Sequence, residues 1–280
     1  GGYNPNTIAQ DIITYVTLDL GCLVVAAAGN NNLEAPIYPA SYEYVLSVAS
    51  SDQNDVRSGF SNFGKTIDII APGNGIYTTT YNNAYRTDSG TSLSAPIVSG
   101  AAALVWANNP TFTSVQVAEQ LRVSADETIY TKNPAYLNKL GKGRLDVLRA
   151  LTLTSPSIRV SNESWVKDDG TSPGPGENAR LYIDFTNYLQ PSSSQLTATL
   201  SSSSPFITIV MNEINLGIIP TNTTIRNSTT PFEVILSAAL PVDQKVEVLL
   251  TFTDGVYQDF QLISFVVPSY IDVNENNIIT

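Results

Sequence analysis

Ser92 is the side chain in this sequence that is best placed to act as a nucleophile. It follows Gly90 and Thr91 and stands at the start of a run of small and apolar residues, 93–106, that is typical of a helix. The first N–H groups of a helix lack internal partners and its dipole is positive at that end, so the position favours an oxyanion. These residues indicate acyl transfer, although a serine at a helix start is also an ordinary capping residue.

The base that such a serine needs is missing from the sequence. A serine nucleophile is normally activated by an adjacent base, most often histidine. The chain contains no histidine. Either the chemistry is not nucleophilic, or the base lies on a part of the protein outside these 280 residues.

Composition limits the partners and the size of the core. The chain has 280 residues, of which 42% are hydrophobic, and this is enough for a large core and favours two domains. The net charge of −11 disfavours nucleic acid and anionic membranes as partners. No apolar run approaches the length of a membrane span, and an acidic, sparsely charged surface fits an extracellular protein.

Cysteine usage excludes two kinds of site. The single cysteine, Cys22, rules out an internal disulfide and a cysteine-based zinc cluster. Because it precedes an apolar run, we expect it to be a buried small hydrophobe at the start of a strand rather than a reactive thiol.

The first half of the chain alternates helical and strand patterns. Apolar residues at helical spacing predict a helix over residues 5–20, and a capped amphipathic helix is predicted over 113–124. Runs that are apolar on consecutive positions are typical of strands buried on both faces of a parallel sheet. These runs are 23–28, 44–49 and 67–71. An α/β layer of this kind gathers functional groups at the strand ends.

The pattern changes near residue 152. From Ser157 onward, short alternating runs separated by Ser, Pro, Gly and Asn turns predict antiparallel strands at sandwich spacing. We therefore predict an α/β domain over 1–153, an all-β sandwich of Ig-like or jelly-roll-like type over 154–270, and a linker over 271–280.

Four segments in the first half resemble subtilisin-like serine peptidases. Residues 90–96, with the small residues 100–104 behind them, are similar to the family's nucleophile motif. Residues 23–30 resemble its strand ending in the oxyanion-hole asparagine, and 69–73 its Ala-Pro-Gly segment. Residues 141–146 resemble the Gly-x-Gly segment before the closing helix. The resemblance implies that residues 1–153 form the C-terminal part of a subtilisin-like catalytic domain.

The resemblance assigns roles to individual residues. It implies that Ser92 attacks the peptide carbonyl, while the Asn30 side chain and the Ser92 backbone N–H stabilise the oxyanion. Gly90, Thr91 and Pro96 support the motif. Small residues suit a cleft in which a peptide approaches the backbone, and the residues implied to line the specificity pocket are Gly1, Gly2, Ala27, Ala28 and Gly29, with Tyr38-Pro39 near its floor.

In this family the catalytic aspartate and histidine precede the oxyanion strand. Asp11 and Asp19 show no aspartate-motif context, and Ile97 stands where many members carry a non-catalytic histidine. We therefore expect an extracellular endopeptidase whose Asp and His come from an N-terminal part of the protein, with this chain alone inactive. The alternative is a non-catalytic binding or scaffold protein with a degenerate peptidase half.

No cofactor is required for this chemistry. The loop containing Asp168, Asp169 and Glu177 carries carboxylates and glycines that could hold a structural calcium ion, although a solvated turn explains the same residues. Substrates are expected to be proteins or peptides.

Overall fold

The computed structural model describes residues 2–267, and the chain divides into two compact units. The first consists of the residues up to Ser157 together with Tyr188–Gln190, and the second of Ile158–Asn187 and the residues from Pro191 onward. The predicted division after residue 153 falls inside the first unit. The predicted linker 271–280 lies outside the described residues. Between residues 2 and 267, no helix has both the length and the apolar composition that crossing a membrane requires.

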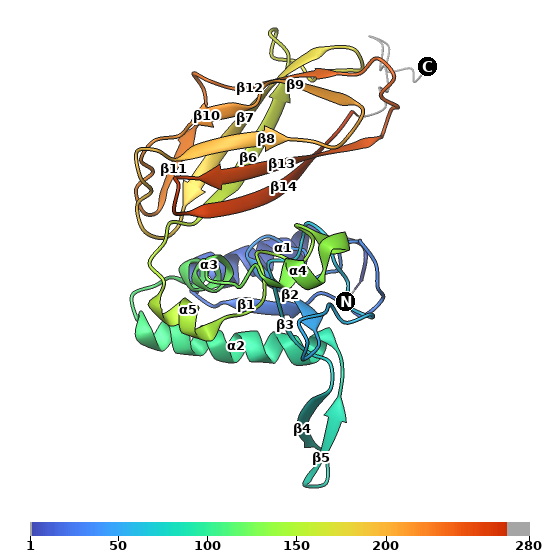
Figure 1. Cartoon of the computed structure of the whole chain (residues 1–280), viewed down its shortest axis with the longest axis vertical. Helices are drawn as coiled ribbons and strands as arrows, with labels where there is room; N and C mark the ends of the chain where they lie inside the picture. Colours follow the sequence, from blue (N-terminus) through green and yellow to red (C-terminus); the bar gives the residue numbers. More distant parts are fainter. Residues whose placement is uncertain (1, 268–280) are drawn as a thin grey trace. The chain divides into compact units, whose positions relative to one another are not determined.

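A three-stranded parallel sheet forms the centre of the first unit (Figure 1). Its strands lie in the order β1 (Val24–Ala27), β2 (Val45–Ser51) and β3 (Ile69–Pro72). All three strands predicted from apolar runs are confirmed. Because parallel strands end at the same edge, the residues that follow β1 and β3 are brought toward one another.

Both faces of this sheet are covered, as the consecutive apolar positions predicted. Side chains alternate between the faces of a strand. On one face Val48 and Ile69 belong to a core cluster with residues of helix α2 (Thr91–Asn108). On the other face Ala49 and Ile70 pack with Ile129 of helix α4 (Ile129–Lys132).

Three of the remaining helices of the first unit begin at side-chain caps. Helix α3 (Ser114–Val123) starts with a reciprocal capping box between Thr113 and Gln116, which confirms the predicted capped helix. The helix expected over 5–20 is present as α1 (Thr7–Thr14), capped by Asn6, and continues as the π-helical segment η1 (Tyr15–Asp19). The other short helices are η2 (Pro134–Tyr136) and α5 (Val147–Thr152).

Strand β1 is an edge strand, and the surface beside it is apolar. No described strand pairs with its outer edge, and all four of its residues are only half-buried. The prediction for Cys22 is wrong, because at this open edge the thiol is exposed. Large apolar side chains on or just after α1 and η1 are also more than half exposed; these are Ile8, Ile12, Tyr15, Leu18 and Leu20.

A two-stranded hairpin was not predicted from the sequence. Strands β4 (Ile76–Thr80) and β5 (Ala84–Asp88) pair antiparallel between β3 and α2. The available signal was Asn82-Asn83, whose backbone φ angles are +60° and +54° in the turn. Asparagine tolerates this left-handed region better than other side chains do.

All strands of the second unit that lie within residues 158–267 pair antiparallel. One sheet has the order β11-β7-β12-β9, with β6 also pairing with β7, and the other has the order β10-β8-β13-β14. The two sheets share one core cluster, in which the rings of Phe185 and Phe252 meet edge to face at 6.0 Å. The strands are β6 (Ile158–Val166), β7 (Asn178–Asn187), β8 (Thr197–Ser201), β9 (Ile207–Met211), β10 (Glu213–Asn215), β11 (Thr223–Arg226), β12 (Phe232–Leu236), β13 (Lys245–Thr253) and β14 (Gln258–Val266).

A buried ion pair holds helix α3 to the last residues of the first unit. Arg122 is 1% exposed, and its Nε donates to Glu119 at 2.7 Å while its Nη2 donates to the Ser157 hydroxyl at 2.9 Å. The Ser157 hydroxyl in turn donates to the same Glu119 oxygen at 2.5 Å. Buried charges are tolerated only when they are paired and hydrogen-bonded in this way.

We expect Arg122→Ala to lower the free energy of unfolding of the first unit by about 3–5 kcal/mol, because it removes the guanidinium that pairs with the buried Glu119 carboxylate. Urea denaturation of the whole chain measures the loss. Lys139→Ala is the matched control, since it breaks the exposed pair with Glu34 and costs at most about 1 kcal/mol. Equal losses in the two variants would contradict the prediction.

Candidate active site

Ser92 lies in the first turn of α2, where the helix meets the ends of β1 and β3. Gly90 is the N-cap and Thr91 the first helical residue, and Ser92 is exposed to solvent. Its backbone N–H is among the first-turn donors that have no intrahelical acceptor. Pro96 follows within the same helix and has no N–H, so it cannot bond to the Ser92 carbonyl in the usual helical pattern.

The side chain of Asn30 is oriented by Thr91. Its Oδ1 accepts hydrogen bonds from the Thr91 backbone N–H at 2.9 Å and from the Thr91 hydroxyl at 2.8 Å. The Thr91 hydroxyl oxygen in turn accepts from Gly29 N–H at 3.2 Å. With the carbonyl end held, the amide Nδ2 lies against the turn at Gly90, 3.5 Å from where a Cβ on that glycine would stand. The Ser92 backbone nitrogen lies 3.7 Å from the same Cβ position, so the Asn30 amide and the Ser92 N–H both lie next to Gly90.

The end of strand β3 and the turn of residues 89–92, here called the nucleophile turn, approach each other too closely for any side chain at Gly73. A Cβ there would come within 2.6 Å of Ser50 Oγ and 2.8 Å of the Gly90 carbonyl oxygen, and would also overlap Ser94 Oγ. Gly90 N–H donates to the Gly73 carbonyl at 2.8 Å, and Ser94 Oγ donates to the Ala71 carbonyl at 3.0 Å. These bonds fix the start of α2 to the end of the sheet.

Sequence reasoning missed Asn62, which holds the turn containing Asn30. Its Oδ1 accepts from the backbone N–H groups of Asn31 and Leu33 at 3.0 and 3.1 Å, and its own N–H donates to Gly29 at 2.9 Å. Asn62 is 1% exposed. The available signal was an asparagine in the segment 58–64, which is rich in Gly and Ser and lies between two of the predicted strands.

The residues predicted to line a specificity pocket lie in adjacent backbone segments. Gly2 pairs antiparallel with Tyr38 through two hydrogen bonds of 3.1 and 2.8 Å. Ile37, which precedes Tyr38 in the chain, lies so close to Gly29 that a Cβ on the glycine would be 2.6 Å from the Ile37 side chain. Ala27 ends β1, Ala28 is buried behind it, and Gly1 lies outside the described residues.

No described residue supplies a base to Ser92. Between residues 2 and 267, no side chain forms a hydrogen bond with its hydroxyl, and Asp11 and Asp19 lie on α1 and at the end of η1. Asp88 is the nearest acid before Ser92 in the chain. The Ser89 backbone N–H and the Arg86 guanidinium hold the pKa of its carboxyl below the usual value, so it stays ionised with both oxygens occupied.

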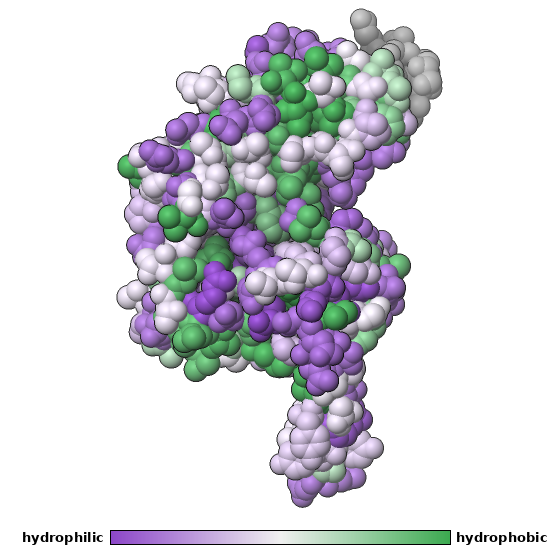
Figure 2. Space-filling view, in the orientation of Figure 1, coloured by the Kyte–Doolittle hydropathy of each residue, from purple (hydrophilic) through white to green (hydrophobic). Residues whose placement is uncertain are grey.

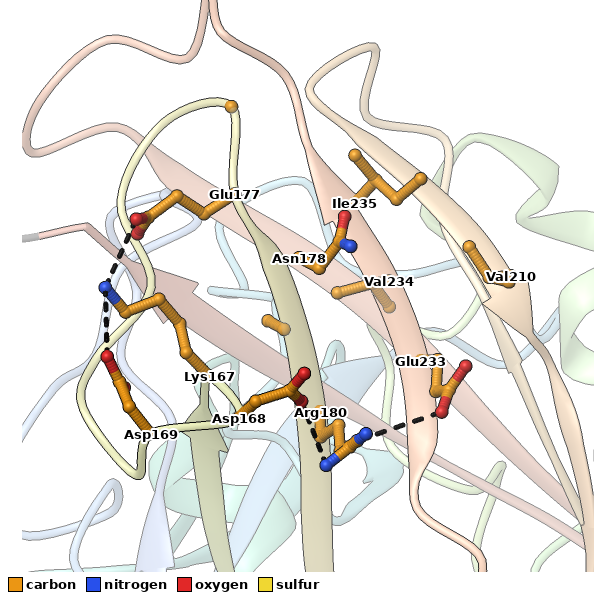
Figure 3. A pocket seen from close by; sticks show the side chains of 12 residues that line it. Lys167, Asp168, Asp169, Glu177, Asn178, Arg180, Val210, Glu233, Val234 and Ile235 are labelled. Carbon is orange, nitrogen blue, oxygen red and sulfur yellow. Dashed lines mark hydrogen bonds and ion pairs between the residues drawn. The ribbon is translucent and has the colours of Figure 1, made fainter.

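A groove on the antiparallel unit is lined by charged side chains that pair with one another. Figure 3 shows this groove of about 630 Å³. Lys167 lies between Glu177 and Asp169 at 3.2 and 3.9 Å, and Arg180 pairs with Asp168 at 2.9 Å. A structural calcium ion was one of two interpretations of this loop, the other being a solvated turn. Within residues 2–267, no group of three or more acidic, thiol or imidazole side chains is placed to hold a metal ion.

Comparison with known proteins finds one family. The sequence matches the Subtilase family over residues 2–143. It is 38% identical to Subtilisin BL of Lederbergia lenta over 125 residues, covering 45% of this chain and 46% of the relative. It is 41% identical to Thermitase of Thermoactinomyces vulgaris over 118 residues, 42% of each chain. The chain thus spans less than half the length of these relatives.

Among solved structures, the prenylagaramide maturation protease PagA is similar, with 29% sequence identity and a TM-score of 0.49. The match covers 54% of this chain and 56% of that one.

We expect Gly73→Ala to destabilise the first unit by about 1–3 kcal/mol, because its methyl group has no room between β3 and the nucleophile turn. Gly100→Ala is the matched control: it lies on α2, its methyl would meet nothing within 4 Å, and it should stabilise the helix by up to about 1 kcal/mol. Both are measured by urea denaturation. A Gly73→Ala variant as stable as the wild type would overturn the packing argument.

Proposed function

We propose, since this chain belongs to the subtilase family, that it supplies the nucleophile and the oxyanion donors of a serine endopeptidase. The first unit has the subtilisin-like α/β fold. One observation carries the proposal: Thr91 holds Asn30 by its carbonyl oxygen, which aims the amide N–H₂ at the turn that presents Ser92. Donors fixed in advance stabilise a developing oxyanion without reorganising, and this is the largest electrostatic contribution in acyl transfer.

In the proposed reaction, Ser92 Oγ attacks the carbonyl carbon of a peptide bond while a histidine base takes the hydroxyl proton. The carbonyl oxygen becomes negatively charged and accepts hydrogen bonds from Asn30 Nδ2 and the Ser92 backbone N–H. The histidine then returns the proton to the leaving nitrogen as the C–N bond breaks. Water hydrolyses the acyl-enzyme by the same route in reverse, so no cofactor is needed.

We propose that the catalytic aspartate and histidine reside on an N-terminal part of the same peptidase. Three observations support this assignment: the chain has no histidine, the outer edge of β1 is unpaired in the described residues, and a row of large apolar side chains on α1 and η1 faces solvent. An unpaired strand edge and exposed large apolar side chains are the kind of surface that a further part of the domain would cover.

The substrate we propose is an extended polypeptide, bound outside the cell. Gly2, Ala27 and Gly29 place backbone rather than bulky side chains around the expected specificity pocket, and a peptide strand can pair only with backbone that it reaches. We propose that the second unit is a β-sandwich accessory module of Ig-like or jelly-roll-like type, because its two sheets share a single core.

We expect Ser92→Ala to abolish covalent labelling by a phosphonate probe and to lower kcat about 10⁶-fold, the magnitude established for the triad serine of subtilisin itself. The protein tested should include the upstream segment with the proposed Asp and His. Ser99→Ala is the matched control, since this exposed serine lies on the same helix and bonds only to the Ala95 carbonyl. Failure of the processed wild type to label would favour the non-catalytic scaffold.

We expect Asn30→Ala to lower kcat about 10²–10³-fold with little change in KM, which is the loss established for the oxyanion asparagine of subtilisin itself. The reason is that the amide donates to charge that exists only in the transition state. Steady-state kinetics on a peptide substrate separate the two constants. A rise in KM at constant kcat would show that Asn30 binds the substrate instead.

A further inference from the structure

The β4–β5 hairpin carries an uncharged aromatic surface. Tyr77, Tyr81 and Tyr85 are 72%, 79% and 62% exposed. The rings of Tyr77 and Tyr85 stack with centroids 5.6 Å apart and planes inclined by 15°. Figures 1 and 2 show that the hairpin stands out from the rest of the first unit, so these rings have no covering element there.

The two faces of the hairpin differ in character. Tyr77 lies opposite Thr87, and Tyr85 lies opposite Thr79, so all four share one face. The ion pair between Arg86 and Asp88, at 2.5 Å, belongs to the other face. The tyrosine face therefore offers aromatic and methyl groups without charge, which suits aromatic or proline side chains.

The root of the hairpin is the same turn that presents Ser92. Gly75 N–H donates to Ser89 Oγ, and Ser89 Oγ donates to Asn74 Oδ1, both at 2.9 Å. Gly90 N–H donates across the root to the Gly73 carbonyl. The two strands are thus clamped directly beside the nucleophile, and a chain held at Ser92 lies at the base of the hairpin.

The hairpin is long enough, and its outer edges are free enough, for an extended peptide to pair with it as a further strand. At about 3.3 Å per residue, Tyr85 lies about 10 Å from Asp88 at the root. Within residues 2–267, β4 and β5 pair only with each other, so each has an outer edge open to hydrogen bonding. An extended peptide can add to such an edge while side chains on one face pack against neighbouring rings.

We propose that the β4–β5 hairpin is a substrate-docking arm, which favours polypeptides with an aromatic or proline residue three to five positions from the cleaved bond. The substrate lies along a free edge and packs that residue on Tyr77 and Tyr85. This inference rests on the proposed function, and it adds a determinant of specificity away from the primary pocket.

The test uses internally quenched peptides that share one cleavage site. In each peptide a single position, two to six residues from the cleaved bond on either side, carries tyrosine or serine. With the protein that includes the upstream segment, tyrosine at one position three to five residues from the bond should raise kcat/KM about three- to tenfold over serine. Tyr77→Ser with Tyr85→Ser should remove this preference. The same variant should cleave a peptide too short to reach the rings as the wild type does.

Two controls lie on the same hairpin. The double replacement of Tyr77 and Tyr85 by phenylalanine keeps the stacked rings and should retain the preference, and Arg86→Ala changes only the other face and should also retain it. Circular dichroism of each variant checks the fold.

Retained phosphonate labelling and short-peptide cleavage, with no positional preference for tyrosine, would overturn the docking arm and leave the proposed function standing. Loss of labelling in the wild type would overturn both. If the serine variant changes only sedimentation and not cleavage, the rings bind a second copy and the proposal is wrong.

Discussion

The contact between the end of β3 and the first turn of α2 is the constraint on which the rest of the site depends. Ser92 and Asn30 lie on different elements, and neither holds the other directly. Gly73 admits the Gly90 backbone and the Ser94 hydroxyl into the same small space, so the start of α2 can take one position relative to the sheet. In this position the Thr91 hydroxyl bonds to Asn30. The orientation of the Asn30 amide therefore depends on the close packing at Gly73.

Much of the first unit could be predicted because its signals are local. The strands at 45–51 and 69–72 are buried and the strand at 24–27 is half-buried, and all three coincide with continuous apolar runs in the sequence. Helix α3 could be predicted from its capping residues, Thr113 and Gln116. Cys22 was misjudged because burial depends on whether a neighbouring strand is present, and sequence pattern carries no information about a strand edge.

Asn62 and the β4–β5 hairpin could not be predicted from local signals of this kind. Asn62 acts through three backbone groups of a turn that precedes it by about thirty residues, and an asparagine in a loop predicts only a turn. The hairpin was missed because neither of its faces is buried, whereas a strand is normally recognised from the alternation of apolar and polar residues. For Asn62 the decisive information is which distant segments of the chain meet.

The open edge of β1 and the apolar row on α1 have a consequence for how the protein is made. Chains are synthesised from the N-terminus, so a covering segment encoded upstream would already have left the ribosome when this edge appears. Its local concentration beside the edge would be in the millimolar range, well above that of any other chain. The order of synthesis would then protect a surface that, in a chain produced on its own, invites pairing with other copies.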